Sequence, residues 1–563
     1  MKKKYLRVSL RIVLIIFALS FKTNAQSIED LVKANQAYNG QKWQDALSEY
    51  QKITIANPYN GEYWFQLGRI QYNLKNYNAS NIAYENAIET GYDLSTSAYN
   101  MACNYSLLNE RKKAISWLNF AVKNGLRGRE ELLSEDTDLD NIRAEEGFQR
   151  LMSPFIPSDI SREEGWSTDL TYLKRKFEIT HYDLFSLIDK ADWENSFDNL
   201  KRNVDHLENF EIIVRLMEIV ASIGAGHSYV IPPFSGINQF NQLPVEFYRF
   251  NDGIYIKSAL DQYSDMVGNK IISINNKPIE EILKKVKRVS NPENIIISDW
   301  TALFYLTLPE VLKYYGFTDN IDNLEITFEN NQGQIVSKNI SSQPFNPQIV
   351  MSKSVLAGWT SMLDASDNGP MYLKNTNKKF WFQQIQDSKV LYAQVNEIRN
   401  GGNKTLKQFG KEITDYISTN DISAFILDLR LNNGGNGLLN RDFLTQIIKC
   451  EKINQRGKFF TIIGRKTFSA AMLLATQLDE YTETVFIGEP TGGSPNMIGD
   501  DNQIVLPYSG LITSASSKYW QSHISYDTRN WIAPEILTSL SSNQYRSGQD
   551  PCVETILDIV SGQ

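Results

Sequence analysis

A polar turn that ends in a lone serine could place a nucleophile at the start of a helix. The turn RKTFS ends at Ser469, and the apolar run AAMLLATQLDEY, which has a helical pattern, follows at once. Amide groups at the N-terminus of a helix point outward and favour negative charge. The amide of Ala470 could therefore stabilise an oxyanion formed when Ser469 attacks a carbonyl. The same pattern also fits an ordinary N-cap, in which the serine only bonds to the helix backbone.

A glycine-rich loop could supply a second oxyanion donor. The loop NNGGNG follows the apolar strand AFILDLRL, and glycine permits the close backbone approach that a bound substrate requires. Gly435 is the candidate donor. The alternatives are a plain strand-to-helix turn and a phosphate loop, although neither GxxxxGK[ST] nor GxGxxG is present.

A serine becomes a nucleophile only if a base takes its proton. His227 lies in IGAGHSYV, just past the end of a helical run, and an imidazole titrates near neutral pH, as general-base catalysis needs. The structural alternative is a helix-terminal or core histidine. Lys466 lies three residues before Ser469 and is expected to be solvated, and His523 is a weaker rival base.

Three motifs together resemble the tail-specific (C-terminal-processing) and tricorn-core family of serine peptidases. They are, in chain order, AFILDLRLNNGG, IIGRKTFSAAMLLA and VFIGEPTGG, and the resemblance extends over about residues 166–536. It implies an α/β core of the ClpP/crotonase type, with Ser469 as the nucleophile. It also implies that Gly435 and Ala470 form the oxyanion hole.

The same resemblance selects His227 as the base. Serine–lysine members of the family carry a T-x-G-K motif, whereas PTGGSP places Ser494 at the position of that lysine. The tricorn-like branch uses a histidine in a G-x-G-H-[ST] context, which IGAGHSYV matches. In that branch an acid near the end of the catalytic domain orients the histidine, and here it would be Asp527 in SYDTRNWIAPEI. A surface aspartate in a turn is the alternative, because Gly226 and Glu535 depart from the pattern of the branch.

The segment MVGNKIISINNKPIEEIL resembles the second half of a PDZ domain, which in tail-specific proteases captures the C-terminal carboxylate of a substrate. Residues 240–290 are therefore expected to form a small PDZ-like, β-rich insertion, although their first half shows no clear GLGF-type loop. Such a domain would bind extended peptide by strand addition. His181, in ITHYDLF, also matches a family position, but it lies in a helical pattern and is expected to be structural.

A 34-residue period dominates the first part of the chain. Ala46, Ser80 and Ala114 share one position of the period, and two further positions hold Tyr50, Tyr84 and Leu118, and Ile53, Ala87 and Ala121. Small residues at fixed positions let paired helices approach closely. The pattern resembles three tetratricopeptide repeats over residues 27–128, which would bind a protein partner. An unrelated helical bundle is the alternative.

The N-terminus reads as a secretory signal peptide over residues 1–25. A basic start, MKKKYLR, precedes the apolar run VLIIFALSF and small residues near Ala25. A membrane anchor is the alternative, but the apolar run has about half of the ~20 residues that a spanning helix needs. No later segment is long and apolar enough to span a bilayer. The sequence therefore predicts an exported protein, periplasmic or extracellular.

Periodicity and composition set the other boundaries. They predict a linker helix over 129–160, a helical N-terminal part of the peptidase domain over 161–239, a β-rich connecting region over 291–380 and an α/β catalytic core over 381–563. In that core, near-continuous apolar strands alternate with helices, which indicates parallel βαβ units covered on both faces. Ligands of such sheets lie beyond the carboxyl ends of the strands, where NNGGNG and RKTFS are placed.

Charge and metal-ligand content exclude other classes of function. The formal net charge is −8, and the first 25 residues hold six basic and no acidic side chains, so the rest of the chain carries −14. This balance argues against nucleic acid as a partner. The three cysteines and four histidines are scattered without CxxC or HExxH spacing, so no metal, cofactor or disulfide framework is expected.

The sequence thus predicts an exported serine endopeptidase that hydrolyses peptide bonds of peptide or unfolded-protein substrates. His227 would deprotonate Ser469, an acyl-enzyme would form, and Asp527 would orient the imidazole. One alternative is a catalytically inactive ligand- or peptide-binding protein of the same fold. Another is a scaffold whose working part is the repeat array.

Overall fold

The computed structural model describes residues 27–126, 133, 135–152, 154, 156–351, 356–363 and 369–562, without the side chains of residues 350 and 351. The chain forms two compact units, Met1–Ser153 and Pro154–Gln563. The expected signal peptide lies outside the described residues. Within the described ranges, no helix combines the length and hydrophobicity that crossing a bilayer requires.

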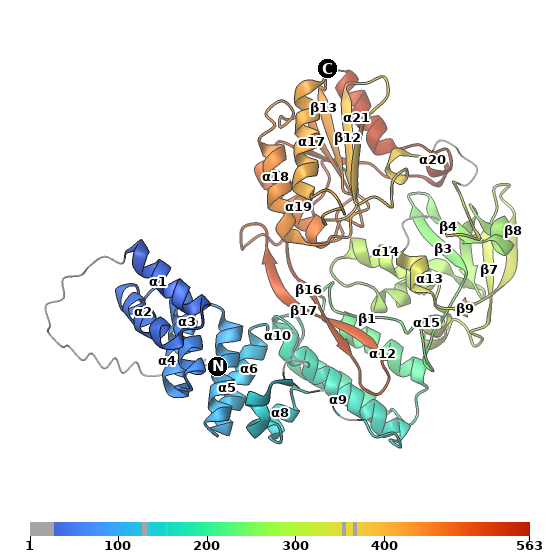
Figure 1. The fold of residues 1–563 in the computed structure, drawn as a ribbon. Helices are drawn as coiled ribbons and strands as arrows, with labels where there is room; N and C mark the ends of the chain where they lie inside the picture. Colours follow the sequence, from blue (N-terminus) through green and yellow to red (C-terminus); the bar gives the residue numbers. More distant parts are fainter. Residues whose placement is uncertain are drawn as a thin grey trace. The chain divides into compact units, whose positions relative to one another are not determined.

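Consecutive helices pack against one another in the first unit (Figure 1). They are α1 (Ile28–Asn39), α2 (Trp43–Ala56), α3 (Gly61–Asn73), α4 (Tyr77–Glu89), α5 (Leu94–Leu107) and α6 (Arg111–Lys123). The starts of α2, α4 and α6 are 34 residues apart, and the small residues Ala46, Ser80 and Ala114 are fully buried on these helices. The period of the sequence is therefore the period of the helix pairs. Their assignment to tetratricopeptide repeats stays a prediction.

A linker helix was expected over 129–160. The described residues 136–152 form short elements instead, the 3-10 helix η1 (Thr137–Ile142) and α8 (Glu146–Gln149). Asp138 accepts a hydrogen bond from the Tyr72 hydroxyl at 2.6 Å, and Asp136 accepts one from Tyr99. These bonds hold the acidic segment against α3 and α5, which a continuous helix leading away from them would not permit.

The second unit begins with helices and continues into a mostly antiparallel sheet. The helices are α9 (Arg162–Thr180), α10 (Leu184–Leu187), α11 (Lys190–Arg202) and α12 (Asn209–Ala221). The sheet has the order β10-β4-β5-β7-β8, with β3 beside β4 and β6 beside β5. Its strands are β3 (Val245–Phe250), β4 (Gly253–Leu260), β5 (Lys270–Ile274), β6 (Lys277–Pro278), β7 (Asn323–Glu329), β8 (Ile335–Ser341) and β10 (Trp359–Ser361).

The expected boundary at residue 290 divides this sheet. The segment 240–290 supplies β3 to β6, but β7, β8 and β10 of the following region complete the hydrogen bonding. The expected β-rich connecting region 291–380 begins with helices instead of strands. Helices α13 (Ile279–Val286), α14 (Ile295–Tyr305) and α15 (Pro309–Tyr314) follow β6 in sequence. Likeness to a PDZ domain stays a prediction.

A largely parallel sheet forms the α/β core. Its order is β11-β12-β13-β14-β15-β18, and β11 alone is antiparallel to its neighbour among these described strands. The strands are β11 (Phe380–Gln384), β12 (Val390–Val395), β13 (Ala424–Asp428), β14 (Phe459–Ile463), β15 (Val485–Gly488) and β18 (Ile536–Leu537).

Helices cover both faces of this sheet, as the alternating pattern predicts. On one face lie α17 (Leu406–Thr419), α18 (Asn440–Ile448) and α19 (Ala470–Tyr481), and on the other lies α21 (Pro551–Ser561) (Figure 1). The side chains of successive residues of β13 pack into the hydrophobic cores on opposite faces of the sheet. Phe425 and Leu427 pack with α17 to α19, whereas Ala424 and Ile426 pack with α21. The shorter elements are η2 (Asp261–Met266), η3 (Lys287–Val289), β2 (Asn241–Gln242), β9 (Gln343–Pro344), α16 (Pro347–Met351), η4 (Met371–Leu373), η5 (Gly437–Leu439) and α20 (Ser542–Arg546).

A long hairpin leaves the core and pairs with a segment far upstream. Its strands are β16 (Asn496–Val505) and β17 (Ile512–Gln521), and β17 also pairs with β1 (Tyr229–Val230) (Figure 1). Next to β1, the hydroxyls of Ser228 and Ser516 form a hydrogen bond of 2.9 Å across 288 positions of sequence. The hairpin therefore fixes the end of α12 relative to the α/β core.

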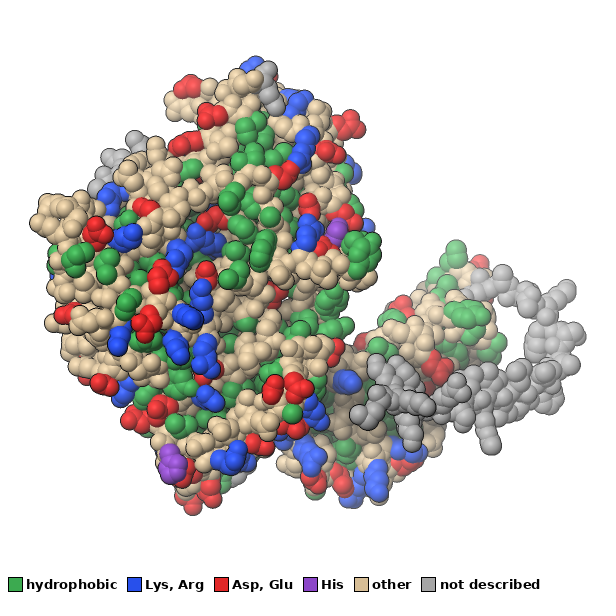
Figure 2. All heavy atoms as spheres, turned by 180° about the vertical axis from the view of Figure 1, so that it is seen from behind, with side chains coloured by type: hydrophobic (Ala, Val, Ile, Leu, Met, Phe, Trp, Pro, Cys, Tyr) green, Lys and Arg blue, Asp and Glu red, His purple; other side chains and the backbone are tan. Residues whose placement is uncertain are grey.

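Basic and acidic side chains lie interspersed on the face shown in Figure 2. Ion pairs with exposed side chains among the described residues include Lys389 with Asp421 and Lys411 with Asp415, each with an N–O distance of 2.6 Å.

Asp169 of α9 holds the tip of the hairpin. Its fully buried carboxylate accepts hydrogen bonds from the amides of Tyr508 and Ser509, each at 2.8 Å. Burial raises the pKa of Asp169, and these bonds partly offset that rise. One side chain thus satisfies two amides of the turn between β16 and β17.

We expect Asp169→Ala to lower the free energy of unfolding by about 1–3 kcal/mol, because both turn amides lose their acceptor. Urea unfolding of the full chain, followed by near-UV circular dichroism, measures the change. Asp198→Ala, on the exposed side of α11, is the control and should stay within about 0.5 kcal/mol of the wild type. Equal stability of the two variants would contradict this role for Asp169.

Candidate active site

Ser469 and His227 lie within hydrogen-bonding distance of each other. The Oγ atom of Ser469 is 3.0 Å from Nε2 of His227. Ser469 connects β14 to α19 through a turn in which its φ is 53° and its ψ is −127°, a conformation that is strained for a residue other than glycine. Its side chain makes no capping hydrogen bond to α19. The turn thus presents the hydroxyl to the imidazole, and the N-cap alternative does not hold.

A backbone anchor and two contacts of the ring fix the imidazole. His227 lies between the glycine-containing end of α12 and β1, so that the pairing of β1 with β17 anchors its backbone. The ring stacks on Phe468, with centroids 4.8 Å apart and planes inclined by 19°. On another side lies Gly499 of β16, where a Cβ atom would be 3.6 Å from Nδ1 of His227. Phe468, which precedes Ser469, and Gly499 of the hairpin together hold the ring in place.

The environment of His227 keeps it neutral at physiological pH. Only 8% of the residue is exposed, and burial lowers its pKa, an effect that the charges of Asp501 and Asp500 partly offset. A neutral imidazole can accept the serine proton, whereas a protonated one cannot. The Nδ1 atom is buried and bonds to no atom among the described residues.

The structure does not bring Asp527 to His227. Asp527 forms an ion pair with Nδ1 of His523 at 2.8 Å and a second one with Arg529 at 2.8 Å. Hydrogen bonds from Arg529 lower the pKa of Asp527. The turn that contains all three residues satisfies the carboxylate locally.

The acids that act on the imidazole are Asp500 and Asp501 of the hairpin. Hydrogen bonds from Lys518 and from the Trp520 indole, at 2.6 Å and 2.9 Å, outweigh burial and lower the pKa of Asp500. Asp501 accepts a hydrogen bond from the Tyr229 hydroxyl at 3.0 Å. Sequence reasoning missed both acids, because only the pairing of β16 and β17 with β1 places them beside the histidine loop.

The glycine loop lies directly against the serine. A Cβ atom on Gly434 would be 2.6 Å from Cβ of Ser469, and one on Gly435 would be 2.4 Å from the carbonyl oxygen of Ile398. Both glycines have positive φ, 113° and 136°. These close approaches require glycine at both positions.

Two amides in this loop region are available to an oxyanion. Within the described residues, neither Gly435 N–H nor Ala470 N–H donates a hydrogen bond to a protein acceptor. Ala470 is the first residue of α19, where helix geometry leaves the amide without an internal partner. The loop itself is held by hydrogen bonds from the Ile398 amide to Gly434 O and from the Asn436 amide to Ile398 O, both at 2.8 Å.

The rival bases lie elsewhere. His181 is buried at the end of α9, and burial lowers its pKa to about 4, in agreement with a structural role. His523 pairs with Asp527. Lys466 was expected to be solvated, but its Nζ lies 4.5 Å from the ring centroid of Trp300.

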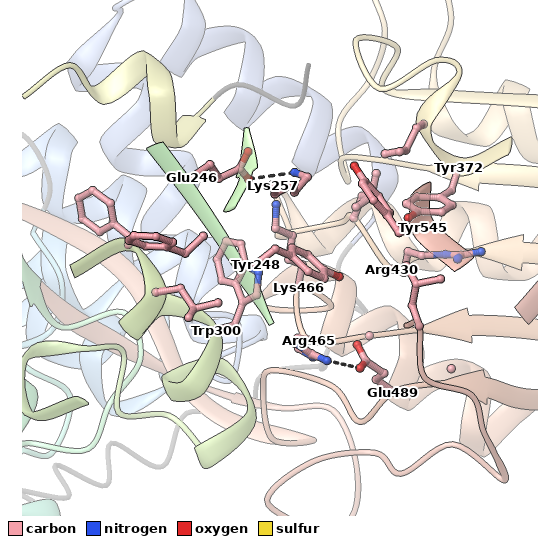
Figure 3. Close-up of a pocket in the computed structure, with 18 of the residues that line it drawn as sticks. Glu246, Tyr248, Lys257, Trp300, Tyr372, Arg430, Arg465, Lys466, Glu489 and Tyr545 are labelled. Carbon is pink, nitrogen blue, oxygen red and sulfur yellow. Dashed lines mark hydrogen bonds and ion pairs between the residues drawn. The ribbon is translucent and has the colours of Figure 1, made fainter. Parts of the chain in front are cut away.

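Lys466 lines a cavity of about 190 Å³ at the carboxyl ends of β13, β14 and β15 (Figure 3). Strands β3 and β4 and helix α14 close its other side. Two ion pairs border it, Glu246 with Lys257 at 2.9 Å and Arg465 with Glu489. Neither Ser469 nor His227 is among the described residues that line this cavity.

Comparison with known proteins identifies the fold. No protein-family model matches the chain, and no curated protein does. The solved structure of mature CPAF complexed with lactacystin matches with a TM-score of 0.51 and 12% identity, over 71% of this chain and 99% of that chain. A CPAF mutant matches with a TM-score of 0.50 and 12% identity, over 70% and 96%. The photosystem II D1 C-terminal processing protease gives a TM-score of 0.33 and 10% identity, over 70% and 99%, which is too low to establish a shared fold.

The chain has the fold of CPAF over 71% of its length. This likeness confirms the coarse architecture expected from the sequence, a helical N-terminal region followed by an α/β domain that contains a parallel sheet. At 12% identity it establishes the fold alone.

We expect Asp501→Asn to lower the pKa of His227 further, because the variant removes a negative charge that favours the imidazolium. Titration of the His227 Hε1 signal by NMR, with labelled histidine, measures the shift. The matched control is Asp527→Asn, which should leave that pKa unchanged. If the control moves the pKa of His227 and Asp501→Asn does not, Asp527 is the acid that acts on the imidazole.

Proposed function

We propose that this protein is a serine-type peptidase that hydrolyses peptide bonds of protein or peptide substrates. The observation that carries the proposal is the 3.0 Å separation between Ser469 Oγ and Nε2 of a buried, neutral His227. The resemblance of three sequence motifs to tail-specific and tricorn-core peptidases supports the same activity, and the fold of CPAF is compatible with it.

The geometry supports an acyl-enzyme mechanism. His227 Nε2 takes the proton as Ser469 Oγ attacks the substrate carbonyl, and the amides of Gly435 and Ala470 stabilise the oxyanion. When the tetrahedral intermediate collapses, His227 returns the proton to the leaving amine. A water molecule, deprotonated by the same imidazole, then releases the acyl group and regenerates Ser469. The negative charges of Asp501 and Asp500 favour the imidazolium that forms in both steps.

Other parts of the chain support a wider role. The basic and apolar segments at the N-terminus favour export to the periplasm or the extracellular space. We propose that the helix pairs α1 to α6 bind a protein partner or the substrate, as tetratricopeptide repeats would. The sheet formed by β3 to β8 and β10 would bind extended peptide as a PDZ-like domain.

A second candidate function is ligand binding without hydrolysis. The cavity in Figure 3 favours it, because ligands of parallel sheets bind at the carboxyl ends of the strands. In that case the serine–histidine pair would be unreactive.

Labelling with a fluorophosphonate probe distinguishes the two functions, because the probe reacts with activated serines. We expect the wild type to be labelled, Ser469→Ala to be unlabelled and His227→Ala to react at least ~10²-fold more slowly. His523→Ala and Lys466→Met are matched controls and should react within twofold of the wild type. Casein digestion by the wild type, absent in Ser469→Ala, would identify the activity as proteolysis. An unlabelled wild type that digests no casein would favour the binding protein.

A further inference from the structure

A short segment between η3 and α14 contacts several loops of the site. We name the segment Asn291–Asn294 the NPEN clip, after its sequence. It belongs neither to the sheet formed by β3 to β8 nor to the α/β core, and the mechanism above does not use it. Its polar side chains make hydrogen bonds to three loops that lie far apart in the sequence, and these bonds suggest a specific role.

Glu293 joins the histidine loop to the loop that follows β15. Its Oε2 accepts a hydrogen bond from the amide of Gly226 at 2.8 Å. The amide of Ser494 approaches this carboxylate and acts to lower its pKa, whereas the Ser494 hydroxyl donates to Asn530 O at 3.2 Å. Gly226 directly precedes His227 in the chain. One carboxylate therefore bonds to the loop of the base and lies beside a second loop at the carboxyl edge of the sheet.

Asn291 binds the carbonyl oxygen of Gly226, the second backbone polar group of that residue. Its Nδ2 donates to Gly226 O at 3.1 Å, and its Oδ1 accepts from the amide of Glu293 at 3.0 Å. The carbonyl of Gly226 belongs to the peptide bond that leads to His227. A Cβ atom on Gly226 would lie 2.8 Å from Cβ of Glu293 and 2.9 Å from Oδ1 of Asn291, so the contact requires glycine. Both polar groups of the residue before the histidine are thus held by the clip.

Asn294 joins a third loop to the clip. Its Nδ2 donates to Thr491 O at 3.3 Å and to Asn530 O at 2.8 Å. Its Oδ1 accepts from the first amides of α14, at Ile296 and Ile297, and so anchors the clip to that helix. The contact with Asn530 reaches the loop that also contains Asp527 and Arg529.

The carboxyl of Glu293 sits in an environment that changes its charge near neutral pH. Burial raises its pKa to about 7, and the hydrogen bonds from Gly226 and Ser494 offset only part of that rise. The charged or titratable groups on the loops packed against the clip are His227, Glu489, Asp527 and Arg529, and those on the adjoining η3 and α14 are Lys287, Arg288 and Asp299. An ionised carboxylate accepts stronger hydrogen bonds than the acid form and does so with both oxygens.

We propose that Glu293 is a positioning residue for the serine–histidine pair. It acts through Gly226 to fix the backbone of His227, and through Ser494 to fix the loop after β15. The role rests on the proposed function, in which His227 is the base for Ser469. Glu293 is not expected to touch the substrate.

The first test compares fluorophosphonate labelling rates of full-length variants. We expect Glu293→Ala to reduce the rate at least tenfold, because the amide of Gly226 loses its acceptor. Glu293→Gln keeps one acceptor oxygen and should recover most of the rate, to within about threefold of the wild type. The matched control is Glu281→Ala on the exposed side of α13, which should behave as the wild type. Wild-type rates in both Glu293 variants would overturn the proposal.

The second test is the pH profile, which a purely structural role would not change. Burial lowers the pKa of His227 below its usual range, so its imidazole is mainly neutral from pH 6.5 upward. The wild-type labelling rate should nevertheless continue to rise from pH 6.5 to 8, as Glu293 ionises and its hydrogen bonds strengthen. Glu293→Gln cannot ionise, so its profile should be flat over this range. Superimposable profiles would refute the role of the carboxylate.

The third test does not depend on activity. Hydrogen–deuterium exchange of peptides covering residues 222–230 and 490–496 should be at least fivefold faster in Glu293→Ala than in the wild type, and unchanged in Glu281→Ala. Unchanged exchange in Glu293→Ala overturns the positioning role whatever the labelling shows. Faster exchange in a protein that is unlabelled even as wild type would support the clip while rejecting the peptidase.

Discussion

The pairing of β1 with β17 is the contact on which the site depends. His227 precedes β1 in the helical part, and Ser469 starts α19 in the α/β core. Three contacts join these parts. They are the two residues of β1 that pair with β17, the hydrogen bond between the hydroxyls of Ser228 and Ser516, and the hydrogen bond from the hairpin tip to Asp169. The hairpin thus joins the segment that contains the base to the core that contains the nucleophile.

The hairpin also sets the electrostatics of the site. It shields the imidazole from water, which lowers the pKa of His227, and it brings two carboxylates that partly restore it. Burial and nearby negative charge thus shift the pKa of this one imidazole in opposite directions. This arrangement differs from a triad in which one buried aspartate bonds to Nδ1, since Asp500 and Asp501 bond to Trp520, Lys518 and Tyr229 instead.

Much of this arrangement is readable from the sequence. The turn before Ser469, the glycine loop, the parallel strands and the 34-residue period are local patterns, and each depends on residues close together in the chain. Asp527 was assigned from its place in a family pattern, but its own turn supplies Arg529 as a closer partner. Asp501 and Glu293 act through contacts between segments more than 60 positions apart, for which no local periodicity exists.

The order of the segments in the chain delays the assembly of the site. His227 and Ser469 are 242 positions apart, and the hairpin that unites them follows both in the sequence. During synthesis, which begins at the N-terminus, the histidine loop and the turn that contains Ser469 are made before β17. The pairing of β1 requires Thr513 and Ser514, so a chain that ends before these residues lacks one of the contacts that align the base. A peptidase built in this way would stay unreactive toward its surroundings until its own synthesis is almost complete.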